Sequence, residues 1–99
     1  MTAIIKRPGQ PAVSQEVENS LKALQNLVGG YIETVSLPHG ICMIVNEEGK
    51  LQGLQPNFRL DHDLIVGTAV FVGVSGEDFC SLSVVQENTV WRMMSWVLT

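Results

Sequence analysis

Charged residues are scarce in this chain of 99 residues, and basic residues are the scarcer kind. Charged side chains make up 16% of the sequence, and six Lys and Arg stand against ten Asp and Glu, so the formal net charge is −4. The basic residues are scattered along the chain: Lys6, Arg7, Lys22, Lys50, Arg59 and Arg92. Because proteins bind nucleic acid through clustered Lys and Arg that displace counterions, we expect no binding to nucleic acid. The ten carboxylates are also too sparse to mimic the charge of DNA.

Cysteine and histidine are few as well, with two of each. Cys42 lies in an apolar segment, where a buried thiol is inert, and Cys80 follows acidic residues whose charge disfavours a thiolate. The triplet Asp61-His62-Asp63 contains metal-ligating types, but neighbouring side chains of an extended chain point in opposite directions. Neither phosphate-binding pattern, G-x-x-x-x-G-K-S/T or G-x-G-x-x-G, occurs in the sequence. We therefore expect no metal site, no cofactor and no enzymatic activity.

Long apolar runs are also missing, since none approaches the roughly 20 residues that a membrane-spanning helix needs. The first five residues are followed at once by Lys6-Arg7-Pro8, which does not fit a signal peptide. We expect no membrane association and a cytoplasmic protein with reduced thiols. Hydrophobic residues make up 45% of the chain, and the thin polar surface that remains favours a homo-oligomer that covers part of the apolar surface. A compact monomer rich in Ser, Thr, Asn and Gln is the alternative.

The first half of the chain has the pattern of four short strands and one helix. The strands are predicted at residues 3–7, 12–17, 31–37 and 41–45, the second of them at a sheet edge because it follows Pro11. Between residues 21 and 28, apolar side chains recur at helical spacing. Asn19 or Ser20 can cap the start of this helix, and Gly29-Gly30 can end it in the left-handed conformation.

The second half predicts a hairpin, a long strand and a second helix. A tight turn at residues 46–50, with Gly49 at positive φ, should let residues 51–54 pair back briefly. Residues 64–74 are predicted to form the longest strand, and Ser83 with Gln86 fits a capping box for a helix over about residues 84–97. These elements predict the α+β class: one domain over residues 1–99, with an antiparallel or mixed sheet and two helices on one side of it.

The segment from Asn46 to Leu60 is the strongest candidate for binding because it is polar, glycine-containing and flanked by apolar runs. Its glycines would let backbone N–H groups approach a ligand. The side chains that could contact a ligand are Asn46, Lys50, Asn57 and Arg59. The alternative is a polar loop whose asparagines cap turns and whose Arg59 pairs with Asp61 or Glu48.

The last ten residues are a second candidate surface, since they contain two tryptophans, two methionines and an arginine. This composition is typical of the buried centres of protein interfaces. Trp91, Met94 and Trp96 are therefore predicted to lie at an oligomer interface. The alternative is a helix packed on its own sheet, and both can hold if Trp91 points inward and Trp96 toward a partner.

Several strings of the sequence resemble a family of proteins, domain of unknown function 3846. They are Ala3-Ile4-Ile5-Lys6-Arg7-Pro8, Leu24-Gln25-Asn26-Leu27-Val28-Gly29-Gly30-Tyr31-Ile32-Glu33, Asn46-Glu47-Glu48-Gly49-Lys50, Pro56-Asn57-Phe58-Arg59-Leu60, Val66-Gly67-Thr68 and Gly76-Glu77-Asp78-Phe79. The resemblance covers about residues 3–82, a family-like core that leaves the C-terminal helix outside it. Members are small proteins carried largely by bacteriophages, plasmids and conjugative elements.

This resemblance implies an accessory role in phage–host conflict, in the host cytoplasm if a phage encodes the chain. We therefore predict a non-catalytic, homo-oligomeric protein that sequesters a small nucleotide-derived signal of host defence. Arg59 and Lys50 would hold the anionic groups, and Tyr31 or Phe58 would stack on a base. The alternative is an inhibitor that docks on a host protein through its Trp- and Met-rich C-terminal helix; a phage structural or regulatory component without a small-molecule site is a third reading.

Overall fold

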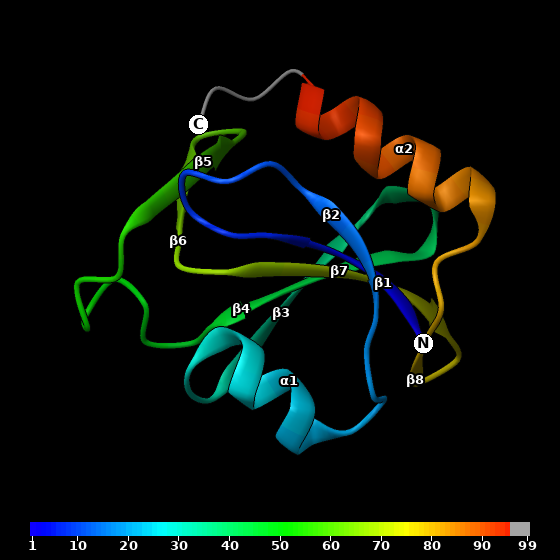
Figure 1. Cartoon of the computed structure of the whole chain (residues 1–99), viewed down its shortest axis with the longest axis horizontal. Coiled ribbons are helices and arrows are strands. Elements are labelled where there is room, and N and C mark those ends of the chain that lie inside the picture. The colour runs from blue at the N-terminus through cyan, green and yellow to red at the C-terminus, as the bar shows by residue number, and fades with distance from the viewer. Residues whose placement is uncertain (96–99) are drawn as a thin grey trace.

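Two helices and eight strands make up the described part of the chain, residues 1–95 of this computed structural model (Figure 1). The strands are β1 (Thr2–Lys6), β2 (Val13–Glu16), β3 (Ile32–Leu37), β4 (Ile41–Asn46), β5 (Pro56–Leu60), β6 (Asp63–Val66), β7 (Ala69–Ser75) and β8 (Asp78–Cys80). The helices are α1 (Leu21–Val28) and α2 (Val84–Ser95), and a short 3-10 helix, Pro38–Gly40, joins β3 to β4. The predicted α+β class is confirmed.

Six strands form one antiparallel sheet in the order β2-β1-β7-β4-β3, with β8 paired to β7 past the start of β1. Every residue of β4 is buried, and β7 is buried from Ala69 to Gly73. Such continuous apolar runs suit strands that are covered on both faces. The sheet is therefore centred on β4 and β7, and β2 and β3 are its edges.

The two helices pack on opposite faces of this sheet, so the prediction that both lie on one side is wrong (Figure 1). Phe71 of β7 belongs to a core cluster with Val90 of α2. Its neighbour Val70 points to the other face and belongs to a cluster with Leu24 and Val28 of α1. Because β4 and β7 are apolar on both faces, each face needs a cover, and one helix supplies each.

The predicted long strand over residues 64–74 is two strands, β6 and β7, separated at Gly67, which has φ 72°. β6 lies outside the main sheet and pairs with β5 in a separate hairpin, which the sequence pattern does not predict. The N–H of Gly67 donates to Gln55 O at 2.8 Å, and a Cβ on Gly67 would lie 2.8 Å from Leu54 Cδ1. Only glycine fits this crowded, positive-φ position, and it lets the chain change sheets.

The predicted hairpin after β4 is also wrong, because residues 47–53 form successive turns and no strand pairs back. Gly49 does not have positive φ; Gly53 does, at 68°. Gly49 is buried, and a Cβ there would lie 2.9 Å from Val66 Cγ2. Its role is therefore close packing of the loop against β6.

Both predicted helix starts are confirmed. Ser20 caps α1, since its Oγ accepts from Ala23 N at 3.1 Å, and Gly29 ends the helix with φ 79°. At α2, Ser83 N donates to Gln86 Oε1 at 2.9 Å, and Gln86 N donates to Ser83 Oγ at 3.1 Å, which is a complete capping box. Gln86 Nε2 also donates to His39 O at 2.8 Å and thereby fixes α2 to the turn between β3 and β4.

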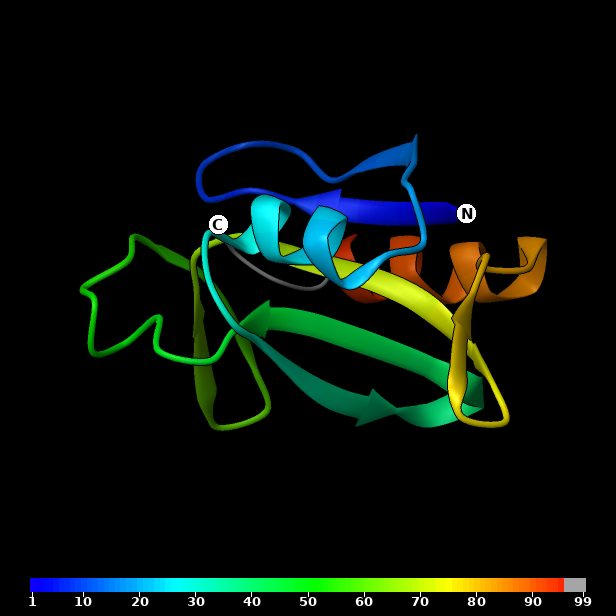
Figure 2. The same cartoon turned by 90° about the horizontal axis from the view of Figure 1, so that it is seen from below.

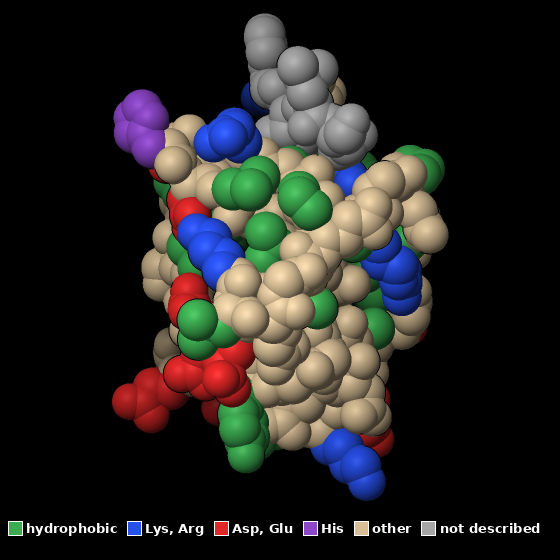
Figure 3. Space-filling model, turned by 90° about the vertical axis from the view of Figure 1, so that its left-hand side faces the viewer, with side chains coloured by type: hydrophobic (Ala, Val, Ile, Leu, Met, Phe, Trp, Pro, Cys, Tyr) green, Lys and Arg blue, Asp and Glu red, His purple; other side chains and the backbone are tan. Residues whose placement is uncertain are grey.

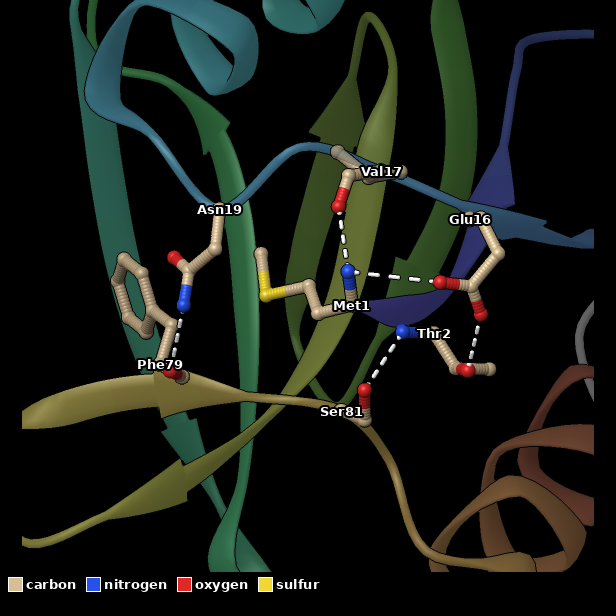
Figure 4. A network of polar contacts seen from close by, with 7 residues as sticks. All are labelled: Met1, Thr2, Glu16, Val17, Asn19, Phe79 and Ser81. Atoms are coloured by element: carbon tan, nitrogen blue, oxygen red, sulfur yellow. Dashed lines mark hydrogen bonds and ion pairs between the residues drawn. The ribbon is translucent and has the colours of Figure 1, made fainter.

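A polar network holds the N-terminus against the end of β2 and the segment that follows β8 (Figure 4). The Met1 ammonium donates to Val17 O at 2.6 Å and lies 3.5 Å from Glu16 Oε2. The Thr2 hydroxyl donates to Glu16 and, with the nearby ammonium, lowers the pKa of that carboxyl. Thr2 N also donates to Ser81 Oγ at 2.8 Å. These contacts fix β1 between two chain segments that are distant in sequence.

Candidate functional site

Two adjoining hollows lie where the β5–β6 hairpin stands off the face of β3 and β4. They have volumes of about 180 and 440 Å³ and share Val35, Asp63 and Ile65. We call the two hollows together the β3 groove. Its floor is apolar and consists of Val35, Leu37, Met43, Val45, Leu60 and Ile65. Two adjoining hollows that share lining residues can receive successive side chains of one extended segment.

The rim of the β3 groove is acidic. Five carboxylates line it: Glu33, Glu47, Glu48, Asp61 and Asp63. Among the described residues that line it, Lys50 is the one Lys or Arg, and its ammonium is paired with Asp63. The hydrogen bond from Lys50 lowers the pKa of Asp63. Figure 3 shows acidic side chains gathered along one side of the face on which β5 and β6 lie, with basic side chains among them. The groove therefore attracts cations and repels phosphate.

Asn46 stabilises the chain's own fold. It is buried at the end of β4, its Nδ2 donates to Val28 O at 3.1 Å, and its Oδ1 accepts from Glu48 N at 2.8 Å. The first bond satisfies a carbonyl at the C-terminus of α1, and the second closes the turn after β4. A Cβ on Gly30 would lie 2.9 Å from Asn46 Nδ2, so the close approach requires glycine at that position. These contacts agree with the alternative expectation for this segment, that its asparagines cap turns.

Asn57 is likewise buried and makes three hydrogen bonds within the chain. Its Oδ1 accepts from Lys6 Nζ at 2.9 Å, and its Nδ2 donates to Lys6 O and Gly67 O, each at 2.8 Å. Lys6 Nζ also donates to Arg7 O at 2.8 Å. Lys6 forms no ion pair with any residue from 1 to 95, and its burial lowers the pKa of its ammonium. The polar amide therefore holds β1 to the β5–β6 hairpin.

The aromatic and arginine residues of the predicted site lie apart. Phe58 is 1% exposed and stacks on Phe71, with ring centroids 6.3 Å apart, so its ring is not available to a base. Arg59 is exposed, forms no ion pair within the described residues, and lines neither hollow of the groove. Tyr31 is 67% exposed beside a different hollow, at the C-terminus of α1. The structure does not bring the six predicted residues together: Lys50 and Asn46 line the groove, and the other four do not.

The described part of the C-terminal helix packs on the chain's own sheet, as the alternative to an interface expects. Val90 is fully buried and Met94 packs against the same core cluster. Trp91 is 37% exposed, so it does not point inward, as it would have to for the helix to pack on its own sheet through Trp91 and meet a partner through Trp96. The helical period explains this, because Trp91 follows the buried Val90 by one residue and so lies on a different side of α2. Trp96 lies outside the described residues, and the interface stays a prediction.

Acidic residues of the groove are the ones that sequence reasoning missed. Glu33 interrupts an otherwise apolar face of β3 that carries Val35 and Leu37. This charged residue was the one sequence signal for the acidic rim, since a charge on the apolar face of a strand marks the point where that face opens to solvent. From the sequence, Asp61 is a possible metal ligand or a partner for Arg59, and Asp63 a possible metal ligand; neither expectation places them at the rim of a groove. Within residues 1–95, no group of three or more His, Cys, Asp or Glu side chains is placed to hold a metal ion.

Replacing Lys6 with methionine is expected to change how stability depends on pH. Burial lowers the pKa of Lys6 from 10.5, so its protonated form is less favourable in the folded chain than in the unfolded chain. The free energy of unfolding of the wild type should therefore rise as the pH rises towards 10.5. The variant lacks this contribution, so urea unfolding should show a wild-type advantage that grows with pH. A difference that stays constant over this range would contradict the desolvation of Lys6.

A family model matches nearly the whole chain. The model of the family described as Domain of unknown function (DUF3846) matches residues 1–95, which includes α2 as well as the segment 3–82 that carries the resemblance. No curated protein and no solved structure matches the chain. None of the helices within residues 1–95 is long and apolar enough to cross a membrane. Because the family model covers nearly the whole sequence, the chain belongs to the DUF3846 family of domains of unknown function.

Proposed function

We propose that this domain acts by binding, not by catalysis, and holds a cationic segment of another protein in the β3 groove. One observation carries the proposal: an apolar floor lies under five carboxylates, and the one basic residue among the described lining is already paired with Asp63. Apolar side chains of a partner can be buried on the floor while its Lys or Arg side chains meet the rim. The apolar contact supplies affinity, and the charges select the partner.

The charge of the rim decides between classes of ligand. Carboxylates at a surface attract a partner's cations by up to about 1 kcal/mol for each pair, and they repel phosphate by a similar amount. The net charge of −4 acts in the same direction over longer distances and speeds the approach of a basic partner. A nucleotide would have to enter this groove against its charge, whereas a basic segment would be attracted to it.

The test compares three fluorescein-labelled heptapeptides that read valine–threonine–valine–threonine–X–threonine–X, in which X is lysine, serine or glutamate, so that the valines and both X residues lie on one face of an extended chain. Fluorescence anisotropy should give the tightest binding for the lysine peptide and the weakest for the glutamate peptide. The double variant Glu33→Gln and Glu48→Gln should bind the lysine peptide about three- to tenfold more weakly than the wild type, because two rim charges are gone. The loss should shrink as salt is added.

A matched control separates the groove from the net charge. Glu18→Gln with Glu87→Gln removes the same number of charges at the start of α1 and in the first turn of α2, and neither residue lines the groove. This variant should bind the lysine peptide as the wild type does, within about twofold. Equal losses in both double variants would show that only the overall charge matters and would refute a site in the groove.

Capture of a nucleotide-derived signal, docking through the C-terminal helix, homo-oligomer formation and a phage-type accessory role stay hypotheses. Arg59 and Tyr31 remain accessible for the first of these, but they lie outside the groove. The geometry therefore favours the protein-binding function, by a surface other than the predicted Trp- and Met-rich helix.

A further inference from the structure

We propose that the bound segment adds to the sheet as a new strand, antiparallel to β3, with alternate side chains in the β3 groove. The inference rests on the proposed function and specifies how the partner is held. β3 is the last strand of the six-stranded sheet, and no other strand within residues 1–95 pairs with its outer side. Figure 2 shows β3 at the margin of the molecule, with the tips of the β5–β6 and β7–β8 hairpins projecting on either side of it.

The register of β3 shows which backbone groups are free. Glu47 N donates to Tyr31 O at 2.8 Å, and Ile32 lies opposite Asn46 in the same register. In an antiparallel pair, hydrogen-bonded residues alternate with residues whose backbone faces away. Tyr31, Glu33, Val35 and Leu37 therefore bond to β4, whereas the N–H and C=O groups of Ile32, Thr34 and Ser36 face the open edge. An incoming strand would find these three residues ready to pair with it.

The two edges of the sheet are not equivalent. β2 is the shorter edge, its four residues are all exposed, and Ser14 Oγ donates to Glu87 of α2 at 3.2 Å. β3 has six residues, and the groove lies directly beside it. Main-chain pairing gives affinity, and a neighbouring hollow gives side-chain specificity. β3 has both features, so it is the edge that fits strand addition.

The side chains of β3 predict the sequence pattern of the partner. Glu33, Val35 and Leu37 point to the groove face, and residues opposite them on an added strand would have Cβ atoms only about 4.5–5.5 Å away. Apolar partner residues suit the positions opposite Leu37 and Val35. A basic residue suits the position opposite Glu33, and a second suits the next groove-facing position, towards Glu47 and Glu48. An antiparallel partner therefore reads apolar–x–apolar–x–basic–x–basic.

The antiparallel direction follows from the rest of the sheet. Every strand pair in the described residues is antiparallel, and such pairs are slightly more stable per residue than parallel ones. A parallel partner would need the reverse order, with its basic residues first. The order of residues in a peptide thus reports the direction in which it binds.

The first experiment uses two labelled heptapeptides of identical composition. One reads valine–threonine–valine–threonine–lysine–threonine–arginine, and the other has the reverse order. Anisotropy titration should give about tenfold tighter binding for the first, because only its charges meet Glu33, Glu47 and Glu48 when its valines meet the apolar floor. Equal affinities, or tighter binding of the reversed peptide, would overturn the antiparallel strand. Equal affinities would not contradict the proposed charge-selective groove. Failure of strand addition can therefore be distinguished from failure of the proposed function.

The second experiment removes one main-chain hydrogen bond without changing the protein. The fourth peptide residue lies opposite Thr34, so its N–H should donate to Thr34 C=O. Methylation of that nitrogen should weaken binding about tenfold, since it removes a donor and places a methyl group against β3. The third residue has its N–H on the other side of the peptide, so the same methylation there should change affinity by no more than about twofold. Equal effects at the two positions would overturn pairing to the edge.

A protein variant gives an independent check. In Thr34→Pro, the lost N–H is one that faces the open edge, so pairing between β3 and β4 can persist. The variant should fold, as judged by cooperative unfolding, and should lose peptide affinity, while Thr34→Ala should keep it. A folded Thr34→Pro that binds as the wild type does would overturn the proposal. So would a peptide-free dimer in sedimentation velocity that Thr34→Pro dissociates, because a second copy of the chain would then occupy the edge.

Discussion

Replacing Asn57 with alanine is expected to lower the free energy of unfolding by about 3–5 kcal/mol, a large part of the stability of a domain of this size. The side chain makes three buried hydrogen bonds, two to Lys6 and one to Gly67. Alanine would leave two buried carbonyls and one ammonium without these partners, and each unsatisfied group costs about 1–3 kcal/mol. Water entering the space would recover part of that loss. Urea denaturation at neutral pH measures the change.

Two controls show that the loss comes from the buried contacts. Asn88→Ala alters an exposed asparagine of α2 and should change stability by no more than about 0.5 kcal/mol, in the stabilising direction. Lys6→Met in the Asn57→Ala background should recover part of the lost stability, because it removes a buried ammonium that has lost its Asn57 acceptor and keeps only the bond to Arg7 O. If Asn57→Ala costs no more than Asn88→Ala does, the three hydrogen bonds contribute nothing and Asn57 is free for another role.

The sequence predicts correctly those helices and strands that are determined by residues close together in the chain. The capping box of Ser83 and Gln86 and the Ser20 cap involve residues three apart, so a short window contains all the information. β4 was evident because its apolar run needs no partner to be recognised. The faces covered by the two helices could not be predicted in this way, since an apolar stripe fits either side of a sheet that is apolar on both sides.

The β5–β6 hairpin was missed because tertiary contacts define it. Residues 56–60 contain a proline, an asparagine and an arginine, which weaken the strand pattern. Their pairing with β6 depends on Gly67, whose positive φ directs the chain out of the main sheet. The sequence shows a glycine within an apolar run, and that pattern is also compatible with an unbroken strand.

The candidate site could not be predicted for the same reason: it depends on contacts between residues that are far apart in the chain. A polar side chain in a loop can face a ligand or its own chain, and the sequence does not distinguish these cases. Asn46 contacts a helix that ends 18 residues earlier, and Asn57 contacts a strand 51 residues earlier. The acidic rim combines Glu33 with Asp63, from strands that are not neighbours in sequence. Only the folded chain brings these carboxylates around one apolar floor.

Phe58→Ala is the second substitution with a large expected effect, again a loss of about 3–5 kcal/mol in the free energy of unfolding. Phe58 is 1% exposed and its ring stacks on Phe71, with an angle of 25° between the ring planes. Alanine would leave a cavity beneath the β5–β6 hairpin and remove the aromatic contact that holds the hairpin to the sheet. Thermal and urea unfolding measure the loss, and Phe58→Leu, which fills more of the space, should lose less.

The same variant separates a structural role of Phe58 from the predicted stacking on a base. Phe58 does not line the β3 groove, so a binding loss in Phe58→Ala would follow from movement of the hairpin that carries Leu60 and Asp63. Phe58→Leu should then bind the lysine peptide nearly as the wild type does, because the hairpin stays in place. If Phe58→Ala were as stable as the wild type, the ring would not be part of the core, and the stacking role would become the better explanation.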